Sequence, residues 1–394
     1  MALQKGNFRV DPRRVKLFTD LNLSPEKLKL IPSKFTEPLP IQRKMLALYV
    51  SDVSTFARSV PNTGKTTSAI MSMLLAEGSS QSVIAAKKHS WINNLVLVPT
   101  PGLADQYQTL LKSFGLNHVQ VLYRNGVDRV KEDEKQHKEL KGILGTKTHS
   151  TLVATPSRLL DYLSSQPHLL KGKLDNIKRL YIDELDMFQH ENPEKTTMLE
   201  TLLQYILDLN KLNQNYPLLT LMSNKSPGPL EFAKLPTLLN QQAEKRFIYD
   251  VSVNPPEWAG QCIYFDSKGD IVSIDNAIEA QSDTRESFNK REIMKDLSRE
   301  QISEKAVEVL KTIWRGAGLV VIPNNSFSPN MILSGLNEQG ISNPVVRVDE
   351  ISGLQLENVN RIYTFNQLSS QEISKLKYML SGDKKELCIV NLDF

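Results

Sequence analysis

Short apolar runs that suit β-strands alternate with helix-forming stretches at least four times in this chain. Such alternation favours a parallel sheet covered by helices, because parallel strands are usually joined by helical crossovers. The strands that we expect are 94–99, 150–154, 179–182 and 218–222, with helices at 67–76, 103–114 and 196–209. The charged segment 131–141 is a solvent-facing helix or loop. The predicted fold class is therefore α/β.

The length and charge of the chain limit its architecture and its partners. With 394 residues it can form two domains, and its net charge of +4 means that any nucleic-acid site must be a local patch. Cys262 and Cys388 cannot build a disulfide framework and are expected to be buried, inert thiols. No apolar run reaches the roughly 18 residues that a membrane span needs.

The strand and helix pattern of the first domain breaks at about 247–256, where Asn254-Pro255-Pro256 punctuates the chain. We expect an N-terminal extension at 1–24, a first domain at 25–246 and a second, smaller α/β domain at 247–394. The second domain should contain strands at 261–265, 318–322, 345–348, 359–365 and 386–392, a polar insertion at about 267–300, and a helix at 329–339. A helix from Glu304 should bury Trp314 in the core.

Gly64-Lys65-Thr66 lies between an apolar stretch and a helix-forming run. A loop that leads into a helix N-terminus presents free N–H groups and a positive dipole end to a phosphate. Lysine adds a mobile charge for the outer phosphates, and the threonine hydroxyl can hold Mg²⁺. The short apolar strand at 179–182 ends in Asp183 and Glu184, which suit a metal ligand and a group that orients water.

Two further helix starts share one design, in which threonine stands at the cap and proline at the first helical position. They are Pro99-Thr100-Pro101-Gly102 and Thr155-Pro156-Ser157-Arg158. Good capping alone could explain both. If both ends leave one parallel sheet in the same direction, their N–H groups would meet successive phosphates of one strand, with Arg158 adding charge.

The order of these motifs resembles the first RecA-like domain of the DEAD-box RNA helicases over roughly residues 30–230. Phe35 with Pro38–Gln42 resembles the adenine-reading Q motif, otherwise a loop with two prolines, and Ser59–Thr66 resembles the Walker A loop. Pro99–Gln106 and Thr155–Arg158 are similar to RNA-contacting motifs, Asp183–Asp186 to the DEAD tetrad, and Ser223–Lys225 to the Ser-Ala-Thr motif. The second domain matches only in outline.

The resemblance implies two RecA-like domains, the second degenerate, that bind ATP, Mg²⁺ and the backbone of single-stranded RNA. It implies nucleotide contacts by Phe35, Gln42, Ser59, Val60, Pro61, Asn62, Thr63, Gly64, Lys65, Thr66 and Thr67. It further implies Mg²⁺ ligation by Thr66 and Asp183, catalysis by Glu184, and RNA contacts by Pro99, Thr100, Gly102, Thr155, Pro156 and Arg158.

Several departures from the family pattern fall on functional positions. Pro61 removes one N–H from the phosphate loop, although Asn62 can still take the left-handed conformation. Leu185 replaces the alanine of the tetrad, and Lys225 replaces a threonine that couples ATP to RNA.

In the second domain, Ser352 and Gln355 stand where an arginine and an aspartate are expected, and no arginine follows Arg361. A missing arginine finger costs on the order of 10³–10⁵ in phosphoryl-transfer rate.

Three functions fit these residues. The first is an ATP- and RNA-binding helicase-like protein with weak or partner-dependent hydrolysis, working in RNA remodelling, translation or ribosome assembly within a larger complex. The second is a non-catalytic RNA-binding and protein-docking adaptor, and the third is a P-loop ATPase that does not act on RNA. The basic start, residues 1–20, is compatible with a fungal mitochondrial protein, and otherwise we expect the cytoplasm or nucleus.

Overall fold

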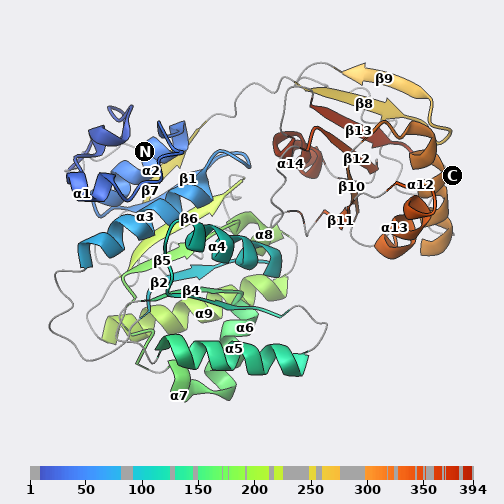
Figure 1. Ribbon diagram of the computed structural model, residues 1–394. Coiled ribbons are helices and arrows are strands. Elements are labelled where there is room, and N and C mark those ends of the chain that lie inside the picture. The colour runs from blue at the N-terminus through green and yellow to red at the C-terminus, as the bar shows by residue number, and fades with distance from the viewer. Residues whose placement is uncertain are drawn as a thin grey trace. The chain divides into compact units, whose positions relative to one another are not determined.

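The chain forms two compact units, Met1–Asn254 and Pro255–Phe394 (Figure 1). The computed structural model describes residues 9–80, 92–124, 129–144, 150–170, 172–175, 177–190, 193–212, 217–224 and 248–253 of the first unit. In the second unit it describes residues 260–275, 298–316, 318–323, 327–341, 344–348, 351, 359–365, 368, 370–380 and 385–392.

The first unit is built on a seven-stranded parallel sheet with the order β3-β4-β2-β5-β6-β1-β7. Its strands are β1 (Ser54–Arg58), β2 (Ile92–Leu97), β3 (Val119–Leu122), β4 (Ser150–Ala154), β5 (Arg179–Ile182), β6 (Leu218–Ser223) and β7 (Ile248–Ser252). The four strands expected from the sequence are confirmed as β2, β4, β5 and β6, with ends shifted by up to two residues.

Helices cover both faces of this sheet. One face carries α2 (Pro40–Val50), α3 (Lys65–Ser80) and α4 (Pro101–Ser113). The other carries α5 (Arg129–Leu144), α6 (Pro156–Ser165), α7 (Pro167–Leu170), α8 (Leu185–His190) and α9 (Pro193–Leu212). The short helices η1 (Phe18–Leu21) and α1 (Pro25–Leu28) precede α2. The charged segment 131–141, left open as helix or loop, lies within helix α5.

The segment around Gln42, interpreted from its two prolines as a loop, is a helix from Pro40 onward. Proline is tolerated at the first helical position because that N–H needs no intrahelical partner. Gln42 closes a capping box by accepting the Leu39 N–H at 2.8 Å. A loop prediction from proline content was therefore wrong for this segment.

The boundaries of the first unit also differ from those expected. Strand β7 pairs with β1, from Ser54 opposite Ile248 to Arg58 opposite Ser252, so this unit continues past 246 to Asn254. At the other end, the expected extension 1–24 is not separate from residue 9 onward. Its apolar side chains are at most 7% exposed and belong to the core of the first unit: Val10, Val15, Phe18 and Leu21.

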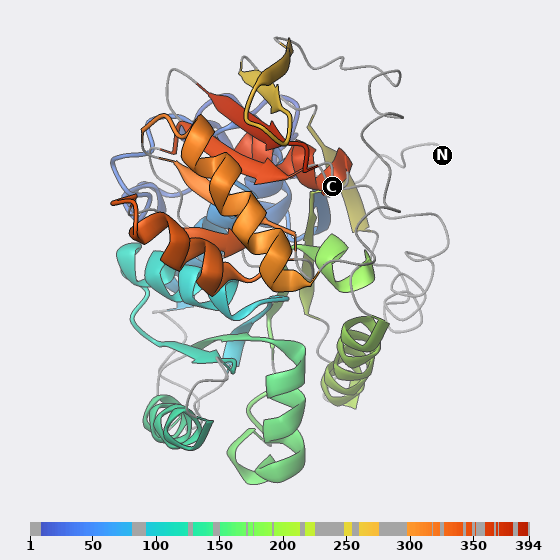
Figure 2. The same ribbon diagram turned by 90° about the vertical axis from the view of Figure 1, so that its right-hand side faces the viewer.

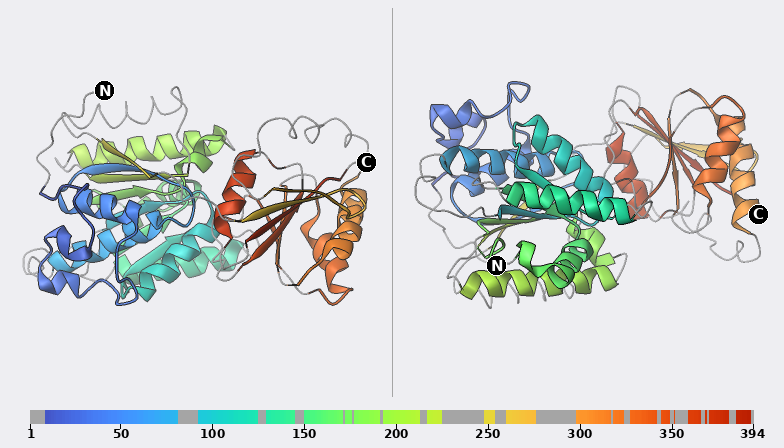
Figure 3. Two further views of the ribbon diagram at one scale, coloured as in Figure 1. Left: turned by 90° about the horizontal axis from the view of Figure 1, so that it is seen from above. Right: turned by 60° about the horizontal axis from the view of Figure 1, so that its bottom comes forward.

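The second unit holds a six-stranded sheet with the order β11-β10-β12-β13-β8-β9, parallel except for the pair β8 and β9. Its strands are β8 (Gln261–Phe265), β9 (Ile271–Asp275), β10 (Leu319–Ile322), β11 (Val345–Arg347), β12 (Arg361–Phe365) and β13 (Glu386–Val390). Helices α12 (Arg299–Ile313) and α13 (Pro329–Asn337) lie side by side on one face, and α14 (Ser370–Met379) lies on the other (Figures 2 and 3).

The predicted polar insertion at 267–300 is not a plain loop in its described parts. Strand β9 lies within it and forms a hairpin with β8, and α12 begins at Arg299 behind a Ser298 capping box. Residues 276–297 of this segment lie outside the described ranges. Ser352, Gln355 and Lys225, on which departures from the family pattern were based, also lie outside them.

The predicted burial of Cys262 and Cys388 in the second unit is confirmed, whereas Trp314 is only partly buried and packs against the core. Trp314 caps α12 and stacks on Tyr363 with ring centroids 4.5 Å apart. Cys262 and Cys388 are both buried as free thiols on neighbouring strands. Burial raises the pKa of the Cys388 thiol to about 12, so it stays protonated and unreactive at neutral pH.

Packing between α12 and α13 depends on a glycine, and this gives a test of the fold. A Cβ on Gly335 would lie 2.8 Å from a methyl carbon of Val307. We expect Gly335→Ala to lower the free energy of unfolding by about 1–3 kcal/mol, because overpacking forces the helices apart. Urea unfolding followed by circular dichroism measures the change.

Gly142 in α5 is the matched control, because nothing lies within 4 Å of a Cβ built there. Gly142→Ala should be neutral or stabilise by up to about 1 kcal/mol through helix propensity. If Gly335→Ala unfolds like wild type, the close contact between α12 and α13 does not exist in solution.

Candidate nucleotide-binding site

The loop between β1 and α3 has the backbone of an anion cradle. Asn62 and Gly64 have positive φ angles of 61° and 95°, and left-handed residues of this kind are typical of loops whose backbone binds an anion. A Cβ on Gly64 would lie 2.6 Å from Gln42 Nε2, so only glycine lets the loop approach α2 this closely. The expectation that Asn62 supplies a left-handed residue is confirmed.

Hydroxyl groups hold this loop in shape. Ser59 Oγ and Thr63 Oγ1 lie 2.5 Å apart, and Thr63 Oγ1 donates to the Val60 carbonyl at 2.8 Å. The Ser59 N–H donates to the Ser223 carbonyl at 3.2 Å, which fixes the loop to the end of β6. Pro61 and Thr67, predicted nucleotide contacts, flank this framework and are half-buried.

Asp183 is the centre of the polar network beside the loop. Its carboxylate is 1% exposed, and its Oδ2 accepts hydrogen bonds from Thr66 Oγ1 and from Tyr107 OH, each at 2.8 Å. These contacts join β5, α3 and α4 at the carboxyl edge of the sheet. The two predicted Mg²⁺ ligands, Thr66 and Asp183, are therefore in direct contact.

Burial raises the pKa of Asp183, because desolvation penalises its charged form; the hydrogen bonds from Tyr107 and Thr66 and the charge of Lys65 oppose this effect. Burial, followed by the Asp183 charge, raises the pKa of the Tyr107 hydroxyl well above its usual value. Tyr107 is consequently a neutral donor. A buried carboxylate of this kind is a site at which a cation would be bound strongly.

Lys65 and Glu184 meet through a third side chain, Asn224. Lys65 is 6% exposed, and its Nζ donates to the carbonyl groups of Ser59 at 2.6 Å and Val60 at 3.0 Å and to Asn224 Oδ1 at 2.8 Å. Asn224 Nδ2 donates to Glu184 Oε2. The predicted phosphate-binding lysine and the predicted catalytic glutamate thus belong to a single hydrogen-bond network.

The aspartate that ends the predicted tetrad ties β6 to this network. Asp186 Oδ1 accepts hydrogen bonds from Ser223 Oγ at 2.9 Å and from the Asn224 N–H at 3.0 Å. Leu185, which stands between Glu184 and Asp186, is fully buried. Its branched side chain is accommodated in the core beneath the site.

The two residues predicted to read adenine are not equally placed for it. Gln42 is 1% exposed and packs against the loop at Gly64, with its Oε1 engaged by Leu39. The Phe35 ring packs against Phe114 at 5.6 Å, under the ammonium of Lys34 at 5.3 Å. Gln42 therefore lies beside the phosphate loop, whereas the Phe35 ring packs against another aromatic side chain of the first unit.

The two Thr-Pro helix starts lie at the same edge of the sheet, because β2 and β4 are parallel neighbours. Thr100 caps α4 by accepting the Leu103 N–H at 3.3 Å, whereas Thr155 stands at the cap of α6 without such a bond. The two helices cover opposite faces of the sheet. Pro99 and Pro156 are buried, and Gly102 is exposed.

Arg158 does not present its charge to the surface. Its side chain is 4% exposed and pairs with Asp133 of α5, while its Nε donates to Gln136 Oε1 at 3.1 Å. The guanidinium also lies 4.6 Å from the ring centroid of Tyr162. In this arrangement Arg158 anchors α6 to α5.

In the second unit, the last arginine of the chain is held within its own sheet. Arg361 on β12 pairs with Glu386 on the adjacent strand β13, and its Nε donates to Glu386 Oε2 at 2.5 Å. Both side chains are about one-fifth exposed. This ion pair bridges two parallel strands and leaves Arg361 with a structural partner.

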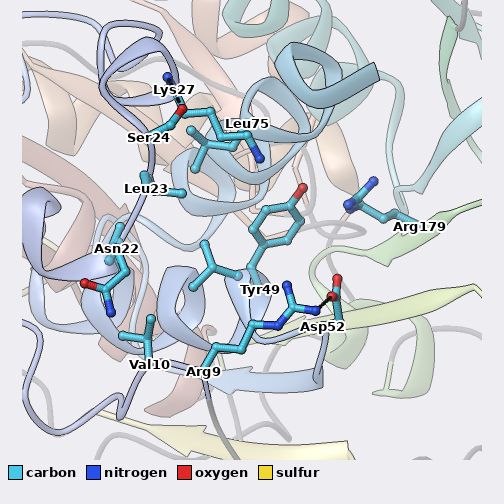
Figure 4. A pocket seen from close by; sticks show the side chains of 12 residues that line it. Arg9, Val10, Asn22, Leu23, Ser24, Lys27, Tyr49, Asp52, Leu75 and Arg179 are labelled. Carbon is cyan, nitrogen blue, oxygen red and sulfur yellow. Dashed lines mark hydrogen bonds and ion pairs between the residues drawn. The ribbon is translucent and has the colours of Figure 1, made fainter. Parts of the chain in front are cut away.

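A separate pocket of about 450 Å³ lies at the opposite edge of the first sheet (Figure 4). Arg179, which begins β5, lines it together with Tyr49, and its guanidinium lies 4.8 Å from that ring. Arg179 Nε has no hydrogen-bond partner among the described residues. None of the predicted site residues lines this pocket, whose cationic wall suits an anion better than a cation.

Two members of the network were missed in the sequence. Tyr107 is buried in the middle of α4, and no local sequence pattern indicates that its hydroxyl contacts Asp183. Asn224 did have a signal, since it stands in the Ser-Ala-Thr segment at the alanine position. Only Lys225 was singled out there.

No cluster of three or more histidine, cysteine, aspartate or glutamate side chains that could hold a metal occurs among the described residues. None of the helices in the described ranges combines the length and apolar character needed to cross a bilayer.

Comparison with known proteins agrees with this geometry. Residues 39–223 match the family model of the DEAD/DEAH box helicases. The chain is 28% identical over 171 residues to the ATP-dependent RNA helicase dbp9 of Aspergillus niger, an alignment that covers 43% of this chain and 26% of that protein. The chain thus spans about a quarter of the length of that relative.

Solved structures of S. cerevisiae Dbp5 share the fold across almost the whole chain. Dbp5 bound to RNA and ADP BeF3 has a TM-score of 0.58 at 14% identity, and the match covers 96% of this chain and 90% of that one. A variant of Dbp5 bound to gle1 and ip6 has a TM-score of 0.57 at 14% identity, with coverage of 96% and 89%. Both units share the fold of these RecA-like proteins, and the match at residues 39–223 places a DEAD/DEAH box helicase domain in the first unit.

Proposed function

We propose that the first unit binds ATP with Mg²⁺ and holds an RNA backbone, and that the chain hydrolyses ATP weakly or only with a partner. The meeting of Lys65, Thr66, Asp183 and Glu184 at one sheet edge carries this proposal. Lys65 and the loop N–H groups would hold the outer phosphates, Thr66 and Asp183 would hold Mg²⁺, and Glu184 would orient water.

The residues present fit a magnesium nucleotide. The Gly64 turn leaves the loop without a side chain at a left-handed position. Mg²⁺ commonly binds through one or two carboxylates, phosphate oxygens and waters, and Asp183 with the Thr66 hydroxyl supplies the protein's share. When bound, the metal would neutralise charge on the phosphates and on the buried Asp183.

Weak or partner-dependent hydrolysis is supported by the arginines. No arginine follows Arg361 in the sequence, and Arg361 is paired with Glu386. An arginine finger accelerates phosphoryl transfer by on the order of 10³–10⁵, so an isolated chain without one should turn over slowly.

RNA binding is supported by the two helix starts at the same sheet edge. The N-termini of α4 and α6 offer N–H groups that suit phosphates of a single strand, without reading its bases. Arg158 would act indirectly, by fixing the start of α6 to α5. The relatives dbp9, named an RNA helicase, and Dbp5, solved with RNA and ADP BeF3, support the same ligands.

The alternative is a non-catalytic adaptor that keeps the site but does not turn over ATP. The engagement of both Lys65 and Glu184 by Asn224 favours it, as does the absence of later arginines from the sequence. In either case we place the chain in a larger complex that remodels RNA, in translation or ribosome assembly. The mitochondrial assignment, made from the basic start, stays a prediction.

Lys65→Ala tests nucleotide binding. Loss of a buried charged donor costs about 2–5 kcal/mol, so affinity for a fluorescent ATP analogue should fall at least about 30-fold. Fluorescence titration with Mg²⁺ measures it, and Lys112→Ala on the exposed side of α4 is the control. Equal affinity in wild type and Lys65→Ala would contradict nucleotide binding at this site.

Glu184→Gln separates the enzyme from the adaptor. The carboxamide keeps its size but cannot accept a proton, so turnover should fall by about 10²–10⁴ while ATP is retained. Phosphate release with RNA and native partners, and mass spectrometry of the bound nucleotide, are the measurements. Identical nucleotide occupancy with no turnover in either protein would leave only the adaptor.

Asp183→Asn tests the cost of the buried charge. Because folding raises the pKa of Asp183 above its usual 3.8, the native state is destabilised as pH rises through and above that value. At pH 7 the variant should melt about 2–4 °C higher per kcal/mol recovered, and this gain should vanish as pH falls below 3.8.

An asparagine can satisfy the same neighbours, because both hydroxyls can accept its N–H groups. Mg²⁺-dependent nucleotide binding should be lost. Asp208→Asn, on the exposed side of α9, should change neither the melting temperature nor its pH dependence. A lower melting temperature for Asp183→Asn at pH 7 would contradict the assigned cost.

A further inference from the structure

Asn224 contacts two side chains, Lys65 and Glu184, that would have to be free to act on a bound nucleotide. Its Oδ1 accepts from Lys65 Nζ at 2.8 Å, and its Nδ2 donates to Glu184 Oε2. Because an ammonium can only donate and a carboxylate can only accept, these partners fix the orientation of the amide. The Asn224 N–H donates to Asp186 Oδ1 at 3.0 Å, so the residue is fixed by its backbone as well.

The ammonium of Lys65 is fully engaged inside the protein. It has three protons, and the Ser59 carbonyl, the Val60 carbonyl and Asn224 Oδ1 provide three acceptors. A phosphate can gain the ammonium only by displacing such acceptors. Of the three, Asn224 alone is a side chain from another strand, reaching the loop from the end of β6.

Glu184, whose carboxylate contacts the same amide, has an unusual backbone conformation. Its φ is +50°, a left-handed value that side chains other than glycine adopt at a cost and that concentrates at functional sites. Its N–H donates to Asp183 Oδ1 at 2.9 Å, and its carboxylate accepts from Asn224. Asp183 therefore fixes the backbone of the candidate catalytic glutamate, and Asn224 fixes its side chain.

We propose that Asn224 is a latch, a positioning residue that holds Lys65 and Glu184 together and must release Lys65 before a nucleotide phosphate can bind. This inference rests on the proposed nucleotide function of the first unit. The latch acts on the protein before nucleotide arrives, so it lowers the fraction of molecules that can bind. Any movement of the end of β6 away from the phosphate loop would break the contact between Asn224 and Lys65 and so raise the affinity of the site for nucleotide.

A latch and a direct nucleotide contact differ kinetically. Removal of a latch raises the binding-competent fraction and hence the association rate, and leaves dissociation unchanged. Removal of a direct contact shortens the lifetime of the complex, so dissociation becomes faster. A residue with a merely structural role would change thermal stability and neither rate.

The test is stopped-flow binding of mant-ADP with Mg²⁺ to the full chain. Asn224→Ala should associate about tenfold faster, the effect of losing one hydrogen bond to a charged group, with the dissociation rate unchanged. Asn224→Asp keeps the acceptor for Lys65 and adds a negative charge, so it should associate more slowly than wild type. Asn330→Ala, at an exposed position in α13, is the matched control and should change neither rate.

The outcomes separate the latch from the proposed function. If wild type binds mant-ADP and Asn224→Ala associates no faster, or dissociates faster, the latch is wrong and nucleotide binding stands. If folded wild type and Asn224→Ala both fail to bind at millimolar mant-ADP, the nucleotide function is wrong and the latch falls with it. Should Asn224→Ala not fold, slower association by Asn224→Asp supports the latch, and equal or faster association overturns it.

Discussion

The first unit is organised around one buried carboxylate. Asp183 directly follows β5 and accepts hydrogen bonds from Thr66 of α3 and Tyr107 of α4. A single charge thus holds the first turn of α3 and the middle of α4 on the same side of the sheet. A charge at 1% exposure is unfavourable unless it is surrounded by donors or a cation. The same carboxylate accepts the Glu184 N–H at 2.9 Å, so it also fixes the backbone of the next residue in the chain.

The second unit has a similar α/β architecture but is not organised around a buried charge. Apolar side chains and two buried thiols form its core, and the pair Arg361–Glu386 links two of its strands. The described residues of this unit include no comparable buried carboxylate. The chemistry that we propose is therefore concentrated in the first unit.

Much of the fold could be predicted from the sequence, because its central strands are continuous apolar runs buried on both faces. The strands that were missed, β1, β3, β7 and β9, are short or lie in segments whose polar residues resemble loops. Helix α2 was missed because proline is read as a breaker, although at the first turn it is tolerated. The boundary at 246 was wrong because β7 belongs to the first sheet only through its pairing with β1.

The sequence by itself determined the α/β class and four central strands of the first sheet, and it predicted Lys65, Thr66, Asp183 and Glu184 as site residues, because these depend on local pattern and residue chemistry. Only the tertiary structure decided which side chains these residues contact. Tyr107 and Asn224 reach the site from another helix and another strand, and Arg158 turns inward to Asp133 instead of outward. Contacts between residues distant in sequence depend on sheet order and helix placement, which no local pattern contains.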